Sequence, residues 1–156
     1  MNAARIAGAV DAALEKFRDE PGPLLEILHA VQHALGCVPP EAVPLIAAGL
    51  NLSRADVHGV ISFYHHFRAA PAGNTVVYLC RAEACQSRDA QSLAEHVQKR
   101  LGIGFGETTP DGRVTLEPVY CLGNCACAPS MLVDGELYGR VTPERFDEIA
   151  AEWAGR

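Results

Sequence analysis

Apolar residues near the start of the chain recur at the spacing of an amphipathic helix. Ile6, Val10 and Leu14 are four residues apart, and Phe17 follows three residues later. This spacing places the four side chains on one face of a helix with 3.6 residues per turn. The run Pro21-Gly22-Pro23 interrupts the pattern, because proline and glycine are strong helix breakers. The pattern therefore predicts a helix that ends before residue 21.

Three further helices are expected before residue 70. The second begins after Pro23 and ends at Gly36, the third spans Glu41 to Gly49, and the fourth starts at the capping-box-like Ser53-Arg-Ala-Asp56. The apolar stripe of the fourth helix contains Val57, Val60, Ile61 and Tyr64. We expect Phe63, Tyr64 and Phe67 to be core residues between the two halves of the chain. Residues 1–72 are thus predicted to form a small helical bundle domain, which would be marginally stable alone.

Beyond Pro71-Ala72-Gly73-Asn74 the pattern changes to strands that alternate with helices. Strands are predicted at Thr75–Leu79 and around Leu116, and a hairpin around Asp134-Gly135, because Asp-Gly favours a type I′ turn. One helix follows the first strand through Leu93, Val97 and Leu101, and the last begins at Thr142-Pro143. The order β-α-β-β-β-α indicates a parallel unit with an added hairpin. The fold class is therefore α+β, with an α/β domain and a mixed sheet over residues 73–156.

Composition and charge argue against nucleic acid and membrane as partners of this chain. The 156 residues carry 13 Lys and Arg against 19 Asp and Glu, a formal charge of −6, so we expect no nucleic acid partner. The N-terminal apolar run is cut short at Asp11, and no apolar stretch reaches the roughly 18 residues of a membrane span. We therefore expect a cytoplasmic protein without membrane insertion, whose cysteines stay reduced.

Four of the six cysteines form two spaced pairs. Cys80 and Cys85 follow the first strand, and Cys121 and Cys125 follow the second. Because parallel strands end at the same sheet edge, the four sulfurs are expected to converge, which suits a structural zinc ion or an iron–sulfur cluster. The wide C-x4-C and C-x3-C loops favour a [2Fe–2S] core, and a Rieske site is excluded because no histidine lies near either pair.

The segment from Cys121 to Val133 contains no charged residue. Its small residues let backbone amides approach sulfur and donate hydrogen bonds, which tune a metal centre. A small and uncharged rim also lets a redox partner come close. Electron transfer benefits from such a rim, whereas structural zinc does not require one.

These motifs together resemble the thioredoxin-like [2Fe–2S] ferredoxin family, which includes the 24 kDa-type subunit of respiratory complex I. The resemblance rests on the two cysteine pairs, on Ala128-Pro129, on Asp134-Gly135-x-x-Tyr138, and on Gly59-Val-Ile-Ser-Phe-Tyr64 with Phe67. It implies a thioredoxin-like second domain. It also implies that Cys80, Cys85, Cys121 and Cys125 ligate one [2Fe–2S] cluster.

The resemblance further implies an electron-transfer subunit with no catalytic residue of its own. Its partner would be a larger flavin-binding, iron–sulfur subunit that binds NAD(H), together with the other subunits of the complex. The short length and the stretch from Val57 to Phe67 look most like the gamma subunit of soluble molybdenum-dependent NAD+ formate dehydrogenases. NADH:quinone oxidoreductase and NAD-linked hydrogenase are the related alternatives.

Other chemistries remain open from the residues alone. Cys127 lies two residues after Cys125 and could replace it as a ligand, although we expect it to be a spectator. A zinc-stabilised assembly module without redox function is one alternative. A thiol oxidoreductase using Cys125 and Cys127 is another, although its C-x-C spacing differs from the usual C-x-x-C.

Overall fold

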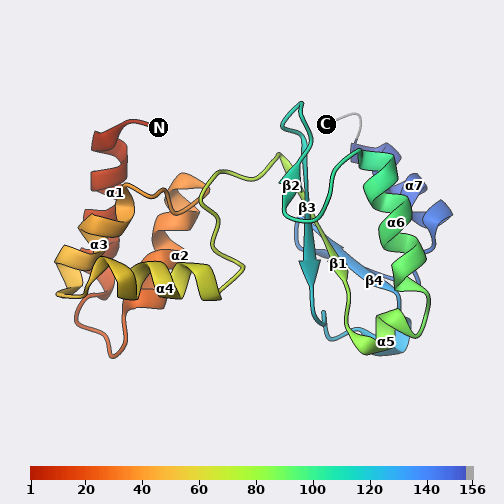
Figure 1. Ribbon diagram of the computed structural model, residues 1–156, viewed down its shortest axis with the longest axis horizontal. Helices are drawn as coiled ribbons and strands as arrows, with labels where there is room; N and C mark the ends of the chain where they lie inside the picture. The colour runs from red at the N-terminus through yellow and green to blue at the C-terminus, as the bar shows by residue number, and fades with distance from the viewer. Residues whose placement is uncertain (154–156) are drawn as a thin grey trace. The chain divides into compact units, whose positions relative to one another are not determined.

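Residues 1–71 form four helices in the computed structural model, which describes residues 1–153 (Figure 1). They are α1 (Ala3–Phe17), α2 (Leu24–Leu35), α3 (Ala42–Leu50) and α4 (Arg54–Phe63). The chain divides into two compact units, Met1–Pro71 and Ala72–Arg156. The four predicted helices are confirmed.

Local capping explains where these helices begin and end. The Asn2 side chain accepts a hydrogen bond from the Arg5 amide at the start of α1. Gly36 ends α2 with φ of 81°, a left-handed conformation that glycine adopts without a Cβ clash. At α4 the Ser53 and Asp56 side chains cap each other's backbone amides, so the predicted capping box is present.

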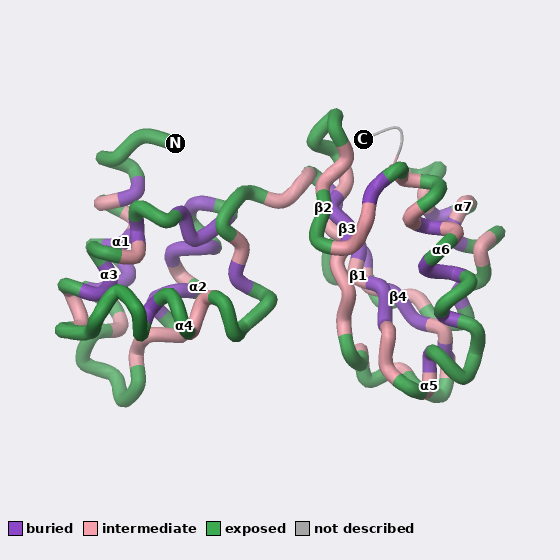
Figure 2. Tube along the Cα trace, viewed as in Figure 1, coloured by how far each residue is buried: buried purple, intermediate pink, exposed green. Residues whose placement is uncertain are grey.

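The core of the helical unit is formed by one apolar stripe from each helix, which Figure 2 shows as buried segments. Ile27, Leu28 and Val31 of α2 lie at its centre and are fully buried. Phe67 belongs to this core and is buried, whereas Phe63 and Tyr64 are 75% and 43% exposed and are not core residues of the helical unit. The helix α4 ends at Phe63, and its buried face is centred on Val57, so Phe63 and Tyr64 fall outside that face.

A buried amide fixes the segment that follows α4. The Gln32 side chain on α2 donates to the His66 carbonyl at 2.8 Å and accepts from the Arg68 amide at 2.8 Å. The Arg68 carbonyl in turn accepts from the Val38 amide at 2.7 Å. A side chain that is 8% exposed thereby satisfies two backbone groups outside any helix.

The second unit is built on a mixed sheet with the strand order β2-β3-β1-β4-β5 among the described residues. The strands are β1 (Thr75–Cys80), β2 (Glu107–Thr108), β3 (Val114–Val119), β4 (Ser130–Val133) and β5 (Glu136–Gly139). Strands β1 and β3 are parallel, with Cys80 opposite Val119, and all other neighbours are antiparallel. The predicted parallel pair and the hairpin are therefore confirmed, and Asp134 and Gly135 have the positive φ angles, 48° and 92°, of a type I′ turn.

Helices α6 (Ala90–Leu101) and α7 (Pro143–Trp153) lie side by side along one face of this sheet (Figure 1). Leu93 and Val97 of α6 and Phe146 and Ile149 of α7 pack into one core with the strands. A hydrogen bond between His96 Nε2 and Asp147 Oδ2, 3.1 Å long, joins the two helices. Strand β2, the short helix α5 (Glu83–Gln86) and the 3₁₀ turn η1 (Cys125–Cys127) were not expected from the sequence.

The architecture is the predicted α+β class, with helices first and then a thioredoxin-like unit with a mixed sheet. Within residues 1–153, no helix is both long and apolar enough to span a bilayer.

Candidate metal centre

The two cysteine pairs lie where the parallel strands end. Cys80 is the last residue of β1, and Cys85 follows in α5. Cys121 comes two residues after β3, and Cys125 begins η1. Because β1 and β3 run in the same direction and are hydrogen-bonded neighbours, their carboxyl ends bring both loops to the same edge of the sheet.

The four sulfurs form two adjacent pairs. The Cys121 and Cys125 sulfurs are 3.7 Å apart, and the Cys80 and Cys85 thiols share a hydrogen bond. The two pairs are also close to each other, because the charge of Cys125 contributes to the raised pKa of Cys85 and the charge of Cys80 contributes to the raised pKa of Cys125. In the described part of the chain, no three His, Cys, Asp or Glu side chains converge on a single-ion site. Two pairs of sulfurs are instead the arrangement that a two-iron core takes, with two thiolates on each iron.

Backbone amides point at these sulfurs, as the small residues of the second loop predicted. The Gly123 amide donates to the Cys121 sulfur at 3.3 Å. Burial raises the pKa of Cys80, but hydrogen bonds from the Ala82, Leu122 and Cys121 amides and from the Cys85 thiol outweigh it and lower that pKa overall. These donors stabilise a thiolate, which is the form that binds metal.

The other members of the pairs have raised thiol pKa values. For Cys85 the causes are burial and then the hydrogen bond and charge of Cys80. For Cys125 they are the hydrogen bond with Cys121 and then the charge of its thiolate. Without metal, two neighbouring thiolates repel each other, so each pair keeps a proton more strongly than separate thiols would. A metal centre held by these cysteines would offset that repulsion, and its binding would be accompanied by release of the thiol protons.

The sequence of the chain matches one family over nearly its whole length. A profile of the thioredoxin-like [2Fe–2S] ferredoxins matches residues 10–154. The chain belongs to the thioredoxin-like [2Fe–2S] ferredoxin family. Membership means that it carries a [2Fe–2S] cluster, and the paired thiols and amide donors of the two loops fit that cofactor. It also sets aside the zinc-stabilised alternative.

Named relatives of this ferredoxin are components of oxidoreductases. One component of the NADH-quinone oxidoreductase from Pseudomonas aeruginosa is 37% identical over 136 residues, which cover 87% of this chain and 82% of the relative. The HndA component of the NADP-reducing hydrogenase from Solidesulfovibrio fructosivorans is 34% identical over 140 residues, which cover 90% of this chain and 82% of the relative.

The fold is shared with a solved structure as well. An NAD+-reducing [NiFe]-hydrogenase in the air-oxidised state superposes with a TM-score of 0.70 at 23% identity over 88% of this chain. The match spans 24% of the hydrogenase chain, so the ferredoxin corresponds to about a quarter of that longer chain. At this identity the likeness shows the fold.

Exposure differs between the two cysteine pairs of the ferredoxin. Cys80 and Cys85 are buried, whereas Cys121 and Cys125 are exposed, and all six cysteines are free thiols among the described residues. Tyr120, directly before Cys121, is 70% exposed. The sequence analysis did not single out this tyrosine. Its position directly before a candidate ligand, next to an uncharged segment, could have marked it as a surface residue near the centre.

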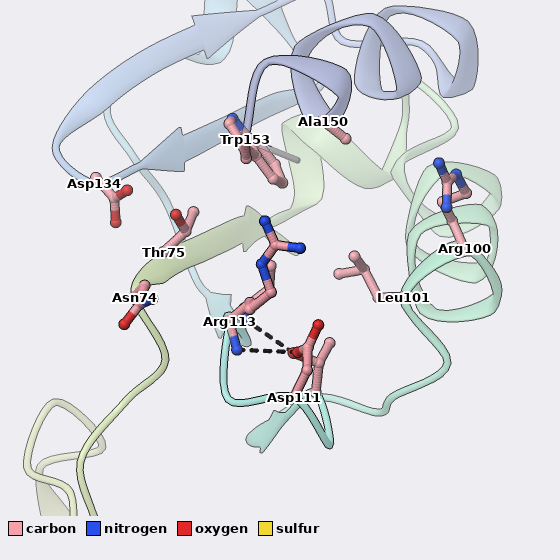
Figure 3. Close-up of a pocket in the computed structure, with 11 residues that line it drawn as sticks. Asn74, Thr75, Arg100, Leu101, Asp111, Arg113, Asp134, Ala150 and Trp153 are labelled. Carbon is pink, nitrogen blue, oxygen red and sulfur yellow. Dashed lines mark hydrogen bonds between the residues drawn. The ribbon is translucent and has the colours of Figure 1, made fainter. Parts of the chain in front are cut away.

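A cavity of about 430 Å³ lies at the opposite end of β1 from the cysteines. Figure 3 shows Thr75, Arg113, Asp111, Leu101 and Trp153 around it, and the Asp111 carboxylate accepts from the Arg113 amide at 3.1 Å. Thr75 begins the strand that Cys80 ends, so this cavity is separate from the candidate metal centre.

Proposed function

We propose that Cys80, Cys85, Cys121 and Cys125 ligate one [2Fe–2S] cluster and that the chain is an electron-transfer subunit. The observation that carries this proposal is the convergence of the two sulfur pairs at the ends of β1 and β3. When bound, such a cluster supplies one-electron redox chemistry. Residues 73–156 would form the cluster domain and residues 1–72 the helical bundle domain.

The chain's own residues would serve electron transfer in two ways. The buried pair, Cys80 and Cys85, anchors one side of the centre in the protein, and the amides of Ala82 and Gly123 stabilise negative charge on sulfur. The exposed pair lies in a segment without charged side chains, from Cys121 to Val133. A partner's redox group can approach this side closely.

The partner is proposed to be a larger flavin- and iron–sulfur-containing subunit that binds NAD(H), in a cytoplasmic complex. Support comes from the names of the relatives, which are NADH-quinone oxidoreductase and hydrogenase subunits. The finer proposal, a subunit of NAD-dependent formate dehydrogenase, is supported by the stretch from Val57 to Phe67 alone. The corresponding subunit of NADH:quinone oxidoreductase or of an NAD-linked hydrogenase is the second candidate, which the relatives favour.

The first experiment counts iron and acid-labile sulfide per chain in anaerobically purified protein. We expect about two of each, the content of a [2Fe–2S] cluster. One iron without sulfide, or four of each, would contradict the proposal. Addition of formate or hydrogen to the purified native complex would then identify the donor, because formate bleaches the visible absorption of the cluster only in a formate dehydrogenase and hydrogen only in a hydrogenase. NADH is the positive control, because it should reduce the cluster through the NAD(H)-binding partner in each candidate complex.

Single substitutions test the ligand assignment. Cys80→Ser, Cys85→Ser, Cys121→Ser and Cys125→Ser should each lower iron content sharply or change the electron paramagnetic resonance (EPR) spectrum of the reduced cluster, because a thiolate ligand is lost. Cys127→Ser should change neither. Cys37→Ala is the control, because Cys37 is buried in the helical unit. Full iron and an unchanged spectrum in any of the four variants would remove that residue from the ligand set.

A further inference from the structure

The hairpin β4–β5 contacts both ligand-bearing segments through one residue, Ser130. This first residue of β4 is 2% exposed. Its backbone amide donates to the Cys85 sulfur. Its hydroxyl lies 3.3 Å from the Asn124 carbonyl and 3.4 Å from the Cys127 carbonyl, and the Asn124 side-chain amide donates to that hydroxyl at 3.2 Å.

The same hairpin holds the backbone of Cys127. The Arg140 amide donates to the Cys127 carbonyl at 2.6 Å. Gly139 is tightly packed against this residue: a Cβ there would lie 2.8 Å from the Cys127 Cβ and 2.7 Å from the Asn124 side-chain nitrogen. The Cβ of Cys127 therefore faces the β5 backbone at Gly139.

The 3₁₀ conformation of η1 separates the two candidate sulfurs. Successive side chains of a 3₁₀ helix are about 120° apart around its axis, so residues two apart do not face the same way. Cys125 and Cys127 are the first and last residues of η1. With Cys125 directed at Cys121, 3.7 Å between sulfurs, Cys127 cannot present its sulfur to the same centre unless η1 rotates or unwinds.

We propose that Ser130 is a positioning residue that locks η1 against the hairpin and thereby makes Cys125, rather than Cys127, the fourth ligand. The inference rests on the proposed function, since it concerns a cluster held by these cysteines. It assigns the seryl hydroxyl a specific task, which is to keep a competing thiol out of the ligand set. Without that hydroxyl, η1 loses its side-chain link to β4 at both of its ends, the Asn124 and Cys127 carbonyls. The Arg140 amide then remains as the hydrogen bond from the hairpin to Cys127, and we expect this single bond to be too little to keep the Cys127 sulfur from the centre.

The test removes the fourth ligand with and without Ser130. In Cys125→Ser, with Ser130 intact, we expect either loss of iron or the altered EPR and resonance Raman spectra of a cluster with one oxygen ligand. In the double variant Cys125→Ser/Ser130→Ala, we expect the iron content and the all-thiolate spectra to recover to at least half of the wild-type signal. Adding Cys127→Ser to the double variant should abolish that recovery.

A matched variant separates positioning from a general loss of stability. Ser130→Thr keeps a hydroxyl, so Cys125→Ser/Ser130→Thr should behave like Cys125→Ser alone. Recovery of all-thiolate spectra in Cys125→Ser itself would overturn the proposal, because Cys127 would then enter despite Ser130. Absence of recovery in the double variant would overturn it too, because something other than Ser130 would keep Cys127 out. A wild-type protein without two iron and two sulfide would instead overturn the proposed function, and this inference with it.

Discussion

At the scale of single residues, the packing around the candidate metal centre is too close to accept added atoms. Gly139 illustrates this, because a Cβ at that position would lie 2.7–2.9 Å from atoms of Asn124 and Cys127, two of them in the backbone of η1 or directly attached to it. Its φ is not in the left-handed region, so the constraint is close approach rather than backbone conformation. The close approach of Asn124 and Cys127 thus leaves no space for a side chain at residue 139.

We predict that Gly139→Ala displaces η1 and destabilises the protein by about 1–3 kcal/mol, the usual cost of overpacking. Iron content should fall together with the midpoint of urea unfolding. Gly8→Ala is the control, because a Cβ at Gly8 meets nothing within 4 Å and the residue lies in α1. Equal effects of the two substitutions, or full iron content in Gly139→Ala, would contradict the role assigned to this glycine.

At the scale of elements, side-chain amides and carboxylates form hydrogen bonds with backbone groups that lie outside the helices or at their ends. Gln32 is such a connection, since it satisfies the His66 carbonyl and the Arg68 amide after α4 has ended. It stands in the apolar stripe of α2 that includes Ile27, Leu28 and Val31. A polar residue on a buried helix face therefore marks a tertiary contact in this unit.

We predict that Gln32→Leu lowers the free energy of unfolding by about 1–3 kcal/mol, because two partly buried backbone groups lose their partner. Chemical denaturation measures this change. His33→Leu, at an exposed position of the same helix, is the control and should be close to neutral. An equally small effect of Gln32→Leu would mean that water replaces the amide.

The capping box at α4 makes a prediction about acid stability. Hydrogen bonds from the Ser53 hydroxyl and amide lower the pKa of Asp56 below its ordinary value of 3.8. A lowered folded-state pKa contributes stability above the unfolded value, and this contribution is lost as pH falls through the folded value. The stability difference between wild type and Asp56→Asn should therefore be constant above about pH 5 and shrink below pH 3.8.

Urea denaturation across this pH range is the measurement for Asp56. The control variant is Asp11→Asn, which removes an exposed carboxylate from α1. A difference between wild type and Asp56→Asn that stays the same from pH 6 to pH 3 would show that the capping box contributes nothing through its charge.

At the scale of the whole molecule, the candidate ligands all belong to one of the two compact units. The four cysteines lie within Ala72–Arg156, and α1 to α4 lie within Met1–Pro71. Binding of a cofactor stabilises the folded state that binds it. We expect this stabilisation to be greatest in the unit that holds the candidate ligands. The two units are therefore expected to respond differently to loss of iron.

We predict that chelation of iron raises amide hydrogen exchange in residues 80–89 and 119–141 and leaves α1 to α4 unchanged. Exchange measured by mass spectrometry on loaded and chelated protein checks this expectation. A chelated Cys37→Ala variant, altered in the helical unit, is the control for general loosening. An equal rise in exchange throughout α1 to α4 would show that the two units respond to the cluster as one.

Most elements of the fold could be predicted because their signals are local. Capping residues and periodic stripes predicted the four helices, and Asp134-Gly135 predicted the hairpin through its positive φ angles. The two-residue strand β2, with Glu107 and Thr108, was missed because it is too short for any alternation. The exposure of Phe63 was missed because an aromatic residue at the end of a helix has no local signal that tells a core position from a surface one.

The sequence by itself determined the chemistry of this ferredoxin. Residue types and spacings decide which thiols are available, where strands and helices form, and that the segment after Cys121 carries no charge. Only the tertiary structure decided which of those thiols lie together. The parallel register of β1 and β3 brings Cys80 and Cys121 to one edge, and the contacts of Ser130 and Gly139 hold Cys127 against the hairpin. The physical reason is that hydrogen bonds and close packing join residues far apart in the chain, and no local pattern encodes such distances.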